Sequence, residues 1–593
     1  MTPAELSELK KRIRKYLDLV VAIAGFLALV CLVAVAGFYL TSGLIRVIMV
    51  ATDIIVAVFI IQEVLRAVLS YHIIAHIRER WKEALIILLL LVELVFPEFF
   101  LNIFSVFFPE MTAIELTLLY LGLLELSLLG ALVMKSLRYF YLFSKLQIHP
   151  GAVLALSFLG AIIFGTLLLM LPRATPGEGQ LPFVDALFTS TSAICVTGLV
   201  VVDTATDFTA FGQAVIFVLL QAGGLGIMTL TTFFASVLGG GLSIQVRLML
   251  RDMMSSESVR EVSMLLGRIA LFTFLMEAIG AAILYYSLTG DLFTLDNRAL
   301  SVAVFHSVSA FCNAGFSLFS DSLMNPMVAH NYGFLTTIMA LIIIGGLGFA
   351  VIMDLSQITW TGSLKYNIRR VLSVGSRLVL AASGFLIIGG TINLFLLDTN
   401  SFGMDMTIWE KMYHAAFLSI TSRTAGFNTT PTAQLTGPVA LMVMMLMWIG
   451  ASPGSTGGGI KTTTFSLAVI KIFNYIRGYE KVEIYHREIE DTSVHRAFMV
   501  ILTSVVVLGL SSLLLVHIEP DKDMLDLLFE ATSAISTVGL SRDVTFHLGT
   551  GGKYVIIFLM FVGRIGVLSF FMAFFRPRGL RRYSLPRESV VVG

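Results

Sequence analysis

Charged residues are scarce in this chain. Asp, Glu, Lys and Arg make up 13% of its 593 residues, whereas soluble domains contain about 25%. Hydrophobic residues make up 57%, and the mean hydropathy is +0.90. A soluble globular protein is therefore excluded, and the composition predicts an all-α polytopic membrane protein embedded in a lipid bilayer. The net charge of +1 gives no sign of a nucleic-acid partner.

Cysteine and clustered metal ligands are also scarce. The three cysteines, Cys31, Cys195 and Cys312, lie in apolar or loop segments without metal-ligand spacing, which predicts neither a disulfide nor a zinc site. His306 and His414 occur singly, and no His/Asp/Glu group at ligand spacing accompanies them. A membrane-embedded enzyme would need such a convergent group, so the sequence predicts a non-enzymatic protein without an organic cofactor.

What the chain has instead is long apolar runs. Four of them, each long enough to cross a bilayer core of about 20 helical residues, fall at 17–40, 45–68, 84–107 and 114–135. They predict an N-terminal four-helix transmembrane domain over residues 1–148. A voltage sensor would need several charges across the membrane field, but Lys135 and Arg138 stand at the end of the fourth run. A purely structural bundle is therefore favoured over a sensor.

A short polar stretch ending in glycine recurs four times after residue 148. The stretches end at Gly198, Gly315, Gly426 and Gly539, at nearly equal intervals. Such a period indicates an internal repeat. We expect four membrane-pore-membrane units around one central pore, at 149–264, 265–371, 372–492 and 493–576, followed by a basic cytoplasmic tail at 577–593.

Each unit contains a short apolar segment just before its glycine, at 182–190, 299–308, 409–420 and 524–532. These segments cannot span a bilayer, and irregular backbone at membrane depth is tolerated only inside protein or beside a wet cavity. We expect re-entrant half-helices whose negative C-terminal ends favour a cation. Amphipathic surface helices are the alternative. The second spans are expected as continuous helices at 211–237, 333–355 and 554–575, with a break in the third unit.

The glycines predict how an ion would be held. A row of backbone carbonyls needs dihedral angles that glycine adopts without steric cost, and rings of carbonyls form selectivity filters. The three residues before each glycine differ between units, which favours carbonyl coordination over side-chain ligands. Asp203, Asp321 and Asp543 follow three loops, either as an outer cation-attracting mouth or as solvated loop acids. The predicted cation filter comprises Cys195, Val196, Thr197, Gly198, Cys312, Asn313, Ala314, Gly315, Arg423, Thr424, Ala425, Gly426, Ser536, Thr537, Val538 and Gly539.

A glycine-rich stretch interrupts the third unit at 450–459. Because apolar sequence flanks it on both sides, it must be a loop inside the membrane. We interpret it as a gate, with a static packing loop as the alternative. A nucleotide-binding P-loop is rejected, since Ile460 intervenes before the lysine and no strand precedes the motif. The gate prediction comprises Gly450, Ser452, Pro453, Gly454, Ser455, Thr456, Gly457, Gly458, Gly459, Lys461 and the mid-span Arg564.

Basic residues cluster in alternate connections, and the positive-inside rule then places both termini in the cytoplasm. The four glycine loops accordingly enter the membrane from the outside. The sequence by itself leaves three functions open: gated or coupled cation uptake, a membrane-embedded enzyme, or the ion-binding subunit of a pump.

Residues 150–576 resemble the Trk/Ktr/HKT superfamily of potassium transporters. The motifs that carry the resemblance are TSTSAICVTGL at 189–199, RTAGFN at 423–428 and SPGSTGGGIKTTT at 452–464. It implies a filter glycine in each unit, a gating loop at 450–459, a pore-facing Arg564, and potassium as the cargo with sodium permeating or assisting. It also implies a homodimer in the bacterial inner (plasma) membrane, seated on a cytosolic ring of nucleotide-binding regulatory subunits.

Overall fold

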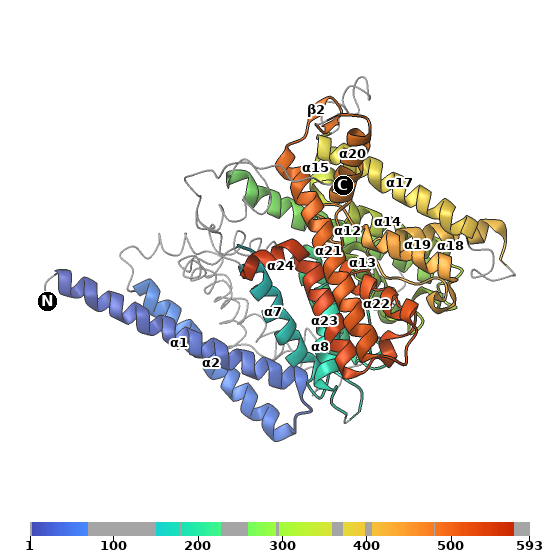
Figure 1. The fold of residues 1–593 in the computed structure, drawn as a ribbon. Helices are drawn as coiled ribbons and strands as arrows, with labels where there is room; N and C mark the ends of the chain where they lie inside the picture. The colour runs from blue at the N-terminus through green and yellow to red at the C-terminus, as the bar shows by residue number, and fades with distance from the viewer. Residues whose placement is uncertain are drawn as a thin grey trace.

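The computed structural model describes residues 3–68, 150–177, 179–226, 259–291, 296–357, 372–397, 406–479 and 481–574 (Figure 1). Helices form nearly all of the regular structure in these ranges. One antiparallel pair, β1 (Glu483–Ile484) with β2 (Arg487–Glu488), pairs Glu483 with Glu488. The expectation of an all-α membrane protein is thereby confirmed. The predicted spans 84–107 and 114–135 and the tail 577–593 lie outside the described residues.

Long apolar helices supply the spans. Five helices within the described ranges are long and apolar enough to cross a bilayer: α2 (Ser42–Val68), α7 (Pro150–Leu169), α12 (Val259–Thr289), α17 (Val374–Leu397) and α21 (Asp491–Ile518). Between 22% and 39% of the residues in their apolar windows are buried. The remaining apolar side chains face outward, where lipid can cover them.

The four predicted short segments are helices that end inside the protein: α8 (Phe183–Ile194), α13 (Asn297–Cys312), α18 (Ile408–Thr421) and α22 (Met524–Ser536). The N-termini of α13 and α22 are capped by Asp296 and Asp523, and α18 begins with a capping box between Thr407 and Glu410. Their last residues are fully or almost fully buried. The surface-helix alternative is therefore wrong.

Three of these short helices bind the preceding long helix through the same hydrogen bond. Ser190 Oγ donates to the Ile162 carbonyl at 2.8 Å, Ser307 Oγ to Glu277 at 2.7 Å, and Ser419 Oγ to Ile387 at 3.0 Å. Three residues further along each long helix stands a glycine, Gly165, Gly280 or Gly390, where an added β-carbon would collide with the same serine hydroxyl. The bonds therefore align α7, α12 and α17 residue by residue.

The second helices of the units differ from the prediction. The span expected at 333–355 is two helices, α14 (Tyr332–Leu347) and α15 (Phe349–Ser356), bent by 96°. That expected at 554–575 is α23 (Thr550–Ile565) and α24 (Val567–Phe574), and α9 (Ala210–Leu225) ends before Gly226. Single continuous spans are thus wrong, because Gly348, Gly566 and Gly226 have φ of +89°, +89° and +77°, which no α-helix accommodates.

The third unit has the expected break. Helix α19 (Gly437–Trp448) and helix α20 (Thr462–Ile476) flank an irregular segment that contains residues 450–459. Ile449 and Ile460 form an isolated parallel bridge across its base. The segment is therefore a compact loop rather than an extended linker.

The N-terminal helices α1 (Pro3–Gly37) and α2 pack against each other and extend away from the other helices in Figure 1. The C-terminal end of α1 contacts the first repeated unit at Arg173. The Arg173 guanidinium donates to the Val35 carbonyl at 2.9 Å, and its backbone N–H donates to Gly37 at 3.0 Å. This contact joins α1 to the end of α7.

Candidate ion-conducting site

The four glycine loops share an unusual backbone. Gly198, Gly315, Gly426 and Gly539 have φ of +95°, +70°, +79° and +94°. The residue two positions earlier also has positive φ in every loop: Val196 (+57°), Asn313 (+59°), Thr424 (+97°) and Thr537 (+50°). The sequence argument assigned this strain to glycine alone. Asn tolerates the left-handed region, whereas β-branched Val and Thr resist it. The local sequence therefore does not predict a positive φ at Val196, Thr424 or Thr537.

The four glycines close into a ring, which we call the glycine ring. A β-carbon built on Gly198 would lie 2.5 Å from the Ala314 carbonyl oxygen, and one on Gly315 would lie 2.7 Å from that of Ala425. A β-carbon on Gly426 would likewise overlap the carbonyl of Val538, and one on Gly539 that of Thr197. Each glycine thus packs on the backbone of the next unit, and the fourth returns to the first.

The carbonyl oxygens of these loops are free. Hydroxyls of the short helices hold the loop backbone: Ser192 Oγ accepts from Gly198 N at 3.1 Å, and Ser533 Oγ accepts from Gly539 N at 3.0 Å. The carbonyls of Thr197, Ala314, Ala425 and Val538 accept no hydrogen bond from any described residue. Buried backbone carbonyls normally have a partner. The ring therefore presents acceptor groups that suit a dehydrated cation.

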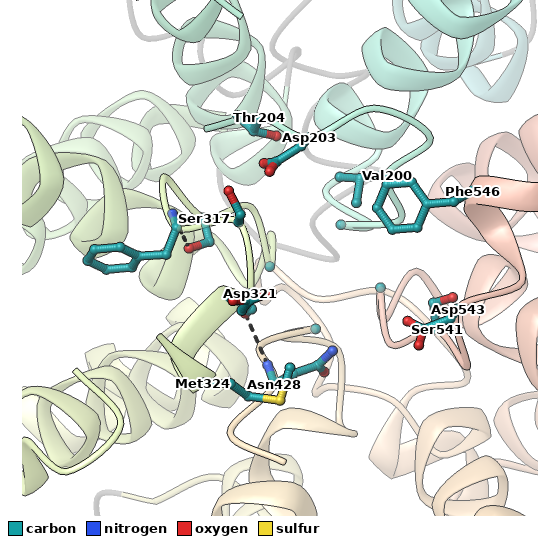
Figure 2. Close-up of a pocket in the computed structure, with 17 residues that line it drawn as sticks. Val200, Asp203, Thr204, Ser317, Asp321, Met324, Asn428, Ser541, Asp543 and Phe546 are labelled. Atoms are coloured by element: carbon teal, nitrogen blue, oxygen red, sulfur yellow. Dashed lines mark hydrogen bonds between the residues drawn. The ribbon is translucent and has the colours of Figure 1, made fainter. Parts of the chain in front are cut away.

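One cavity of about 470 Å³ opens onto the glycine ring, and we call it the ring cavity. All four ring glycines line it, together with Asp203, Asp321 and Asp543, which approach it from three units (Figure 2). Their carboxylates give this cavity a negative potential that attracts cations. The three acids therefore belong to a common mouth and are not scattered on separate surface loops.

The side chains of the predicted filter residues point elsewhere. The Arg423 guanidinium is buried and donates to Ser383, to its hydroxyl at 3.2 Å and to its carbonyl at 3.4 Å. The thiols of Cys195 and Cys312 are buried as well. The structure thus brings the four glycines to the cavity, and it places these three side chains behind the loops.

Two buried residues fix the cavity wall: Glu530, which the sequence argument missed, and His306, which it named only as a lone histidine. Glu530 on α22 accepts hydrogen bonds from Thr545 Oγ1 at 2.6 Å, from the Arg542 backbone at 3.0 Å and from the Ser541 hydroxyl. His306 Nε2 bonds Ser317 Oγ at 3.0 Å. Both Ser541 and Ser317 line the ring cavity. A lone buried Glu within a short apolar helix was the available signal for Glu530.

The glycine-rich loop packs against the filter loops from another side. Thr456 Oγ1 donates to the Phe311 carbonyl at 3.1 Å and lies 3.2 Å from the Asn313 amide. β-Carbons on Gly457 and Gly458 would overlap the hydroxyls of Thr424 and Thr537. None of these loop residues lines the ring cavity. The absence of side chains at Gly457 and Gly458 is thus what allows the loop to lie directly against the four glycine loops.

Two cationic side chains hold this loop. Arg564 donates to the Thr456 carbonyl at 2.5 Å and to the Gly223 carbonyl, and so bridges the loop to α9. Lys461 Nζ donates to the Gly457 carbonyl at 2.7 Å. Both line a second cavity of about 310 Å³ with Gly458 and Gly459. The loop, Lys461 and Arg564 form one connected group, as the sequence argument had grouped them.

The second helices approach the short helices closely because of glycine. β-Carbons on Gly223, Gly345 and Gly563 would overlap the carbonyls of the residues that lie four positions before the ring glycines of their units, namely Ile194, Phe311 and Ile535. Glycine therefore lets α9, α14 and α23 touch the ends of the short helices. The shared contact also aligns these three helices with one another.

The fold and site define a polytopic all-α membrane protein in which four helix-loop-helix units surround one ring of backbone carbonyls. Residues 155–579 match the TrkH family, described as a cation transport protein, and the chain belongs to this family. The family is one of transporters rather than enzymes. The match begins after the N-terminal 154 residues, so the N-terminal helices lie outside it.

Several characterised proteins are similar. The "Ktr system potassium uptake protein B" of Bacillus subtilis (strain 168) is 36% identical over 429 residues, covering 72% of this chain and 93% of that protein. The "Potassium/sodium uptake protein NtpJ" of Enterococcus hirae is 32% identical over 453 residues, covering 75% and 98%. The crystal structure of the potassium transporter TrkH from Vibrio parahaemolyticus matches with a TM-score of 0.54 at 18% identity, over 70% of this chain and 83% of that one. The last comparison supports the fold.

Proposed function

We propose that this protein takes up potassium across the plasma membrane through the glycine ring. The observation that carries the proposal is the closed ring of loop carbonyls without hydrogen-bond partners among the described residues. A ring of carbonyl oxygens can replace the hydration shell of a potassium ion. The names of the Bacillus and Enterococcus relatives, which are potassium and potassium/sodium uptake proteins, support this cargo. Sodium is the second ion that the ring is proposed to admit.

In this proposal the filter consists of the backbone at 195–198, 312–315, 423–426 and 536–539. The ring cavity faces outward and gathers cations with its three aspartates, and both termini lie in the cytoplasm. The loop at 450–459 is the gate on the cytoplasmic side. Its packing against Thr424 and Thr537, and its attachment to Arg564, support an occluding role.

Two assembly proposals accompany the function. The chain is proposed to act as a homodimer in the bacterial inner membrane and to bind a cytosolic nucleotide-binding regulatory ring. The resemblance of the motifs at 423–428 and 452–464 to the Trk/Ktr/HKT superfamily supports both. Nucleotide would act through that ring, because the loop at 450–459 does not have the P-loop pattern.

Ion flux in proteoliposomes that contain this chain alone tests the function. We expect potassium flux that greatly exceeds sodium flux at equal gradients, with voltage clamped by an ionophore. Flux down the potassium gradient that ignores sodium and protons identifies a gated channel, and uphill movement driven by either ion identifies a coupled transporter. Well-folded protein without any flux, even with a regulatory ring added, would refute the proposal.

A further inference from the structure

Glu277 is a polar residue at a position that is apolar in the corresponding long helices of the other units. The three serine bonds that align α7, α12 and α17 place Glu277 where the other two helices have Ile162 and Ile387. An aliphatic side chain therefore suffices for packing at this position. A carboxyl in its place, 5% exposed and at membrane depth, requires another explanation.

Gln221 on α9 is likewise a polar residue at a position that is apolar in the corresponding second helices. The aligned glycines Gly223, Gly345 and Gly563 place Gln221 where α14 and α23 have Ile343 and Phe561. Its Nε2 lies 3.1 Å from both carboxylate oxygens of Glu277. The two exceptional polar residues thus meet each other between the first and second units.

The Glu277 carboxylate has no cationic partner in the described part of the protein: no Lys, Arg or His nitrogen lies within 4 Å of it. Helix α9 contains no ionisable residue, and α14 contains Tyr332 at its outer end. From α13 only the Cys312 thiol reaches it, at 3.8 Å. Burying an ionised carboxylate without a counter-charge costs several kcal/mol, so the site calls for a positive charge.

Two uncharged oxygens on the same elements also lack partners among the described residues. Thr273 Oγ1 and Gln221 Oε1 are buried and form no hydrogen bond with any of them. Thr273 precedes Glu277 by one helical turn and shares its face. A helical threonine usually bonds the carbonyl of the turn before it, so its free hydroxyl is a second indication of a missing ligand. Rotation of the Gln221 amide would turn Oε1 toward the carboxylate, which is favourable when a cation or a proton lies between the two oxygens.

The third unit carries a fixed positive charge at the corresponding place. The same alignment matches Thr273 with Ser383, and the Ser383 hydroxyl accepts from the Arg423 guanidinium at 3.2 Å. Arg423 and Cys312 each stand three residues before their ring glycine. The second unit therefore has the acceptors of that arrangement but not its cation.

We propose that Glu277, Gln221 and Thr273 form a binding site for a sodium-sized monovalent cation between α9 and α12. One carboxylate balances one charge, whereas calcium takes six to eight oxygen ligands and usually more than one carboxylate. A carboxylate also has a stronger field than carbonyls and favours the smaller ion. Bound behind Cys312, the cation supports the second filter loop without entering the pore. This role rests on the proposed function, but the binding itself does not.

Thermal unfolding of the purified full-length protein tests the site without transport. Titrations with NaCl, KCl and choline chloride are compared at constant ionic strength. We expect the Tm to rise with Na+ in a saturable way and at lower concentration than with K+, because an ion that binds only the folded protein stabilises it. Glu277→Gln and Glu277→Ile should each weaken the apparent Na+ affinity at least about tenfold. Glu483→Gln, an exposed matched control on β1, should retain the wild-type affinity.

Thr273→Val keeps the test decisive if the Glu277 variants do not fold, and it should weaken Na+ binding several-fold. A wild-type Tm that Na+ raises no more than choline does would overturn the proposal. A Glu277→Gln variant with wild-type Na+ affinity would also overturn it, and so would a Tm that rises equally with K+. If acid alone raises the Tm, the bound species is a proton and not a metal cation. Sodium binding without potassium uptake would refute the proposed function and leave this site intact.

Discussion

The α-carbon of Gly198 lies 2.9 Å from the place that a β-carbon would take on Gly539, so the first and last pore units meet through glycine. Gly539 contacts Gly198 in the same way as Gly198 contacts Gly315. All four units therefore contribute a glycine to one closed ring. A single side chain at any of the four positions would push a neighbouring carbonyl out of place. The pore is thus sensitive to substitutions that a simple loop would tolerate.

We predict that Gly198→Ser lowers the preference for potassium over sodium by about tenfold. Serine would be strained at φ +95° and would displace the Ala314 carbonyl. The ratio of rubidium to sodium uptake in proteoliposomes measures the effect. Gly160→Ser is the matched control, because nothing lies within 4 Å of that glycine on α7. An unchanged ratio in the Gly198 variant would rule out the carbonyl filter.

Deleting residues 457–459 is expected to increase flux. The loop lies directly against Thr424 and Thr537, and shortening it removes the backbone that, in the proposed function, occludes the path. Initial potassium flux per folded protein, with folding checked by size exclusion, is the measurement. Equal or lower flux through well-folded protein would favour the static packing loop.

Replacing Arg564 by alanine should also raise the leak. The guanidinium bridges the Thr456 and Gly223 carbonyls, and without it the loop loses its attachment to α9. Arg564→Lys should be intermediate, since an ammonium keeps the charge but not the planar fork. Arg496→Ala, at an exposed position on α21, should match the wild type. A decrease in flux for Arg564→Ala would mean that the arginine assists conduction rather than closure.

Glu530→Gln is expected to reduce both stability and selectivity. The carboxylate accepts from three donors, and an amide directs its own NH2 at one of them, at a cost of about 1–3 kcal/mol. The Tm and the rubidium-to-sodium ratio should fall together because Ser541 lines the ring cavity. Asp521→Asn, an exposed control before α22, should change neither quantity. Lower stability at unchanged selectivity would limit Glu530 to a structural role.

Hydropathy, segment length and glycine spacing predicted the apolar spans, the four short helices and the break in the third unit. These features depend on local sequence, because a bilayer requires a minimum apolar length and irregular backbone needs glycine. The bend at Gly348 and the helix break at Gly566 were missed because the helix on either side is apolar. The strained backbone of Val196 and Thr537 was missed because those residue types favour the opposite conformation.

The amino-acid sequence by itself determined that this is a membrane protein of four similar units with one glycine loop in each. The tertiary structure decided how the loops pack: each ring glycine lies against a backbone carbonyl of the next unit, Arg423 turns back to Ser383, and Glu277 meets Gln221. The physical reason is distance along the chain. Hydrophobic length and backbone preference are properties of neighbouring residues, whereas ring closure and charge balance depend on contacts between units that lie far apart in the sequence.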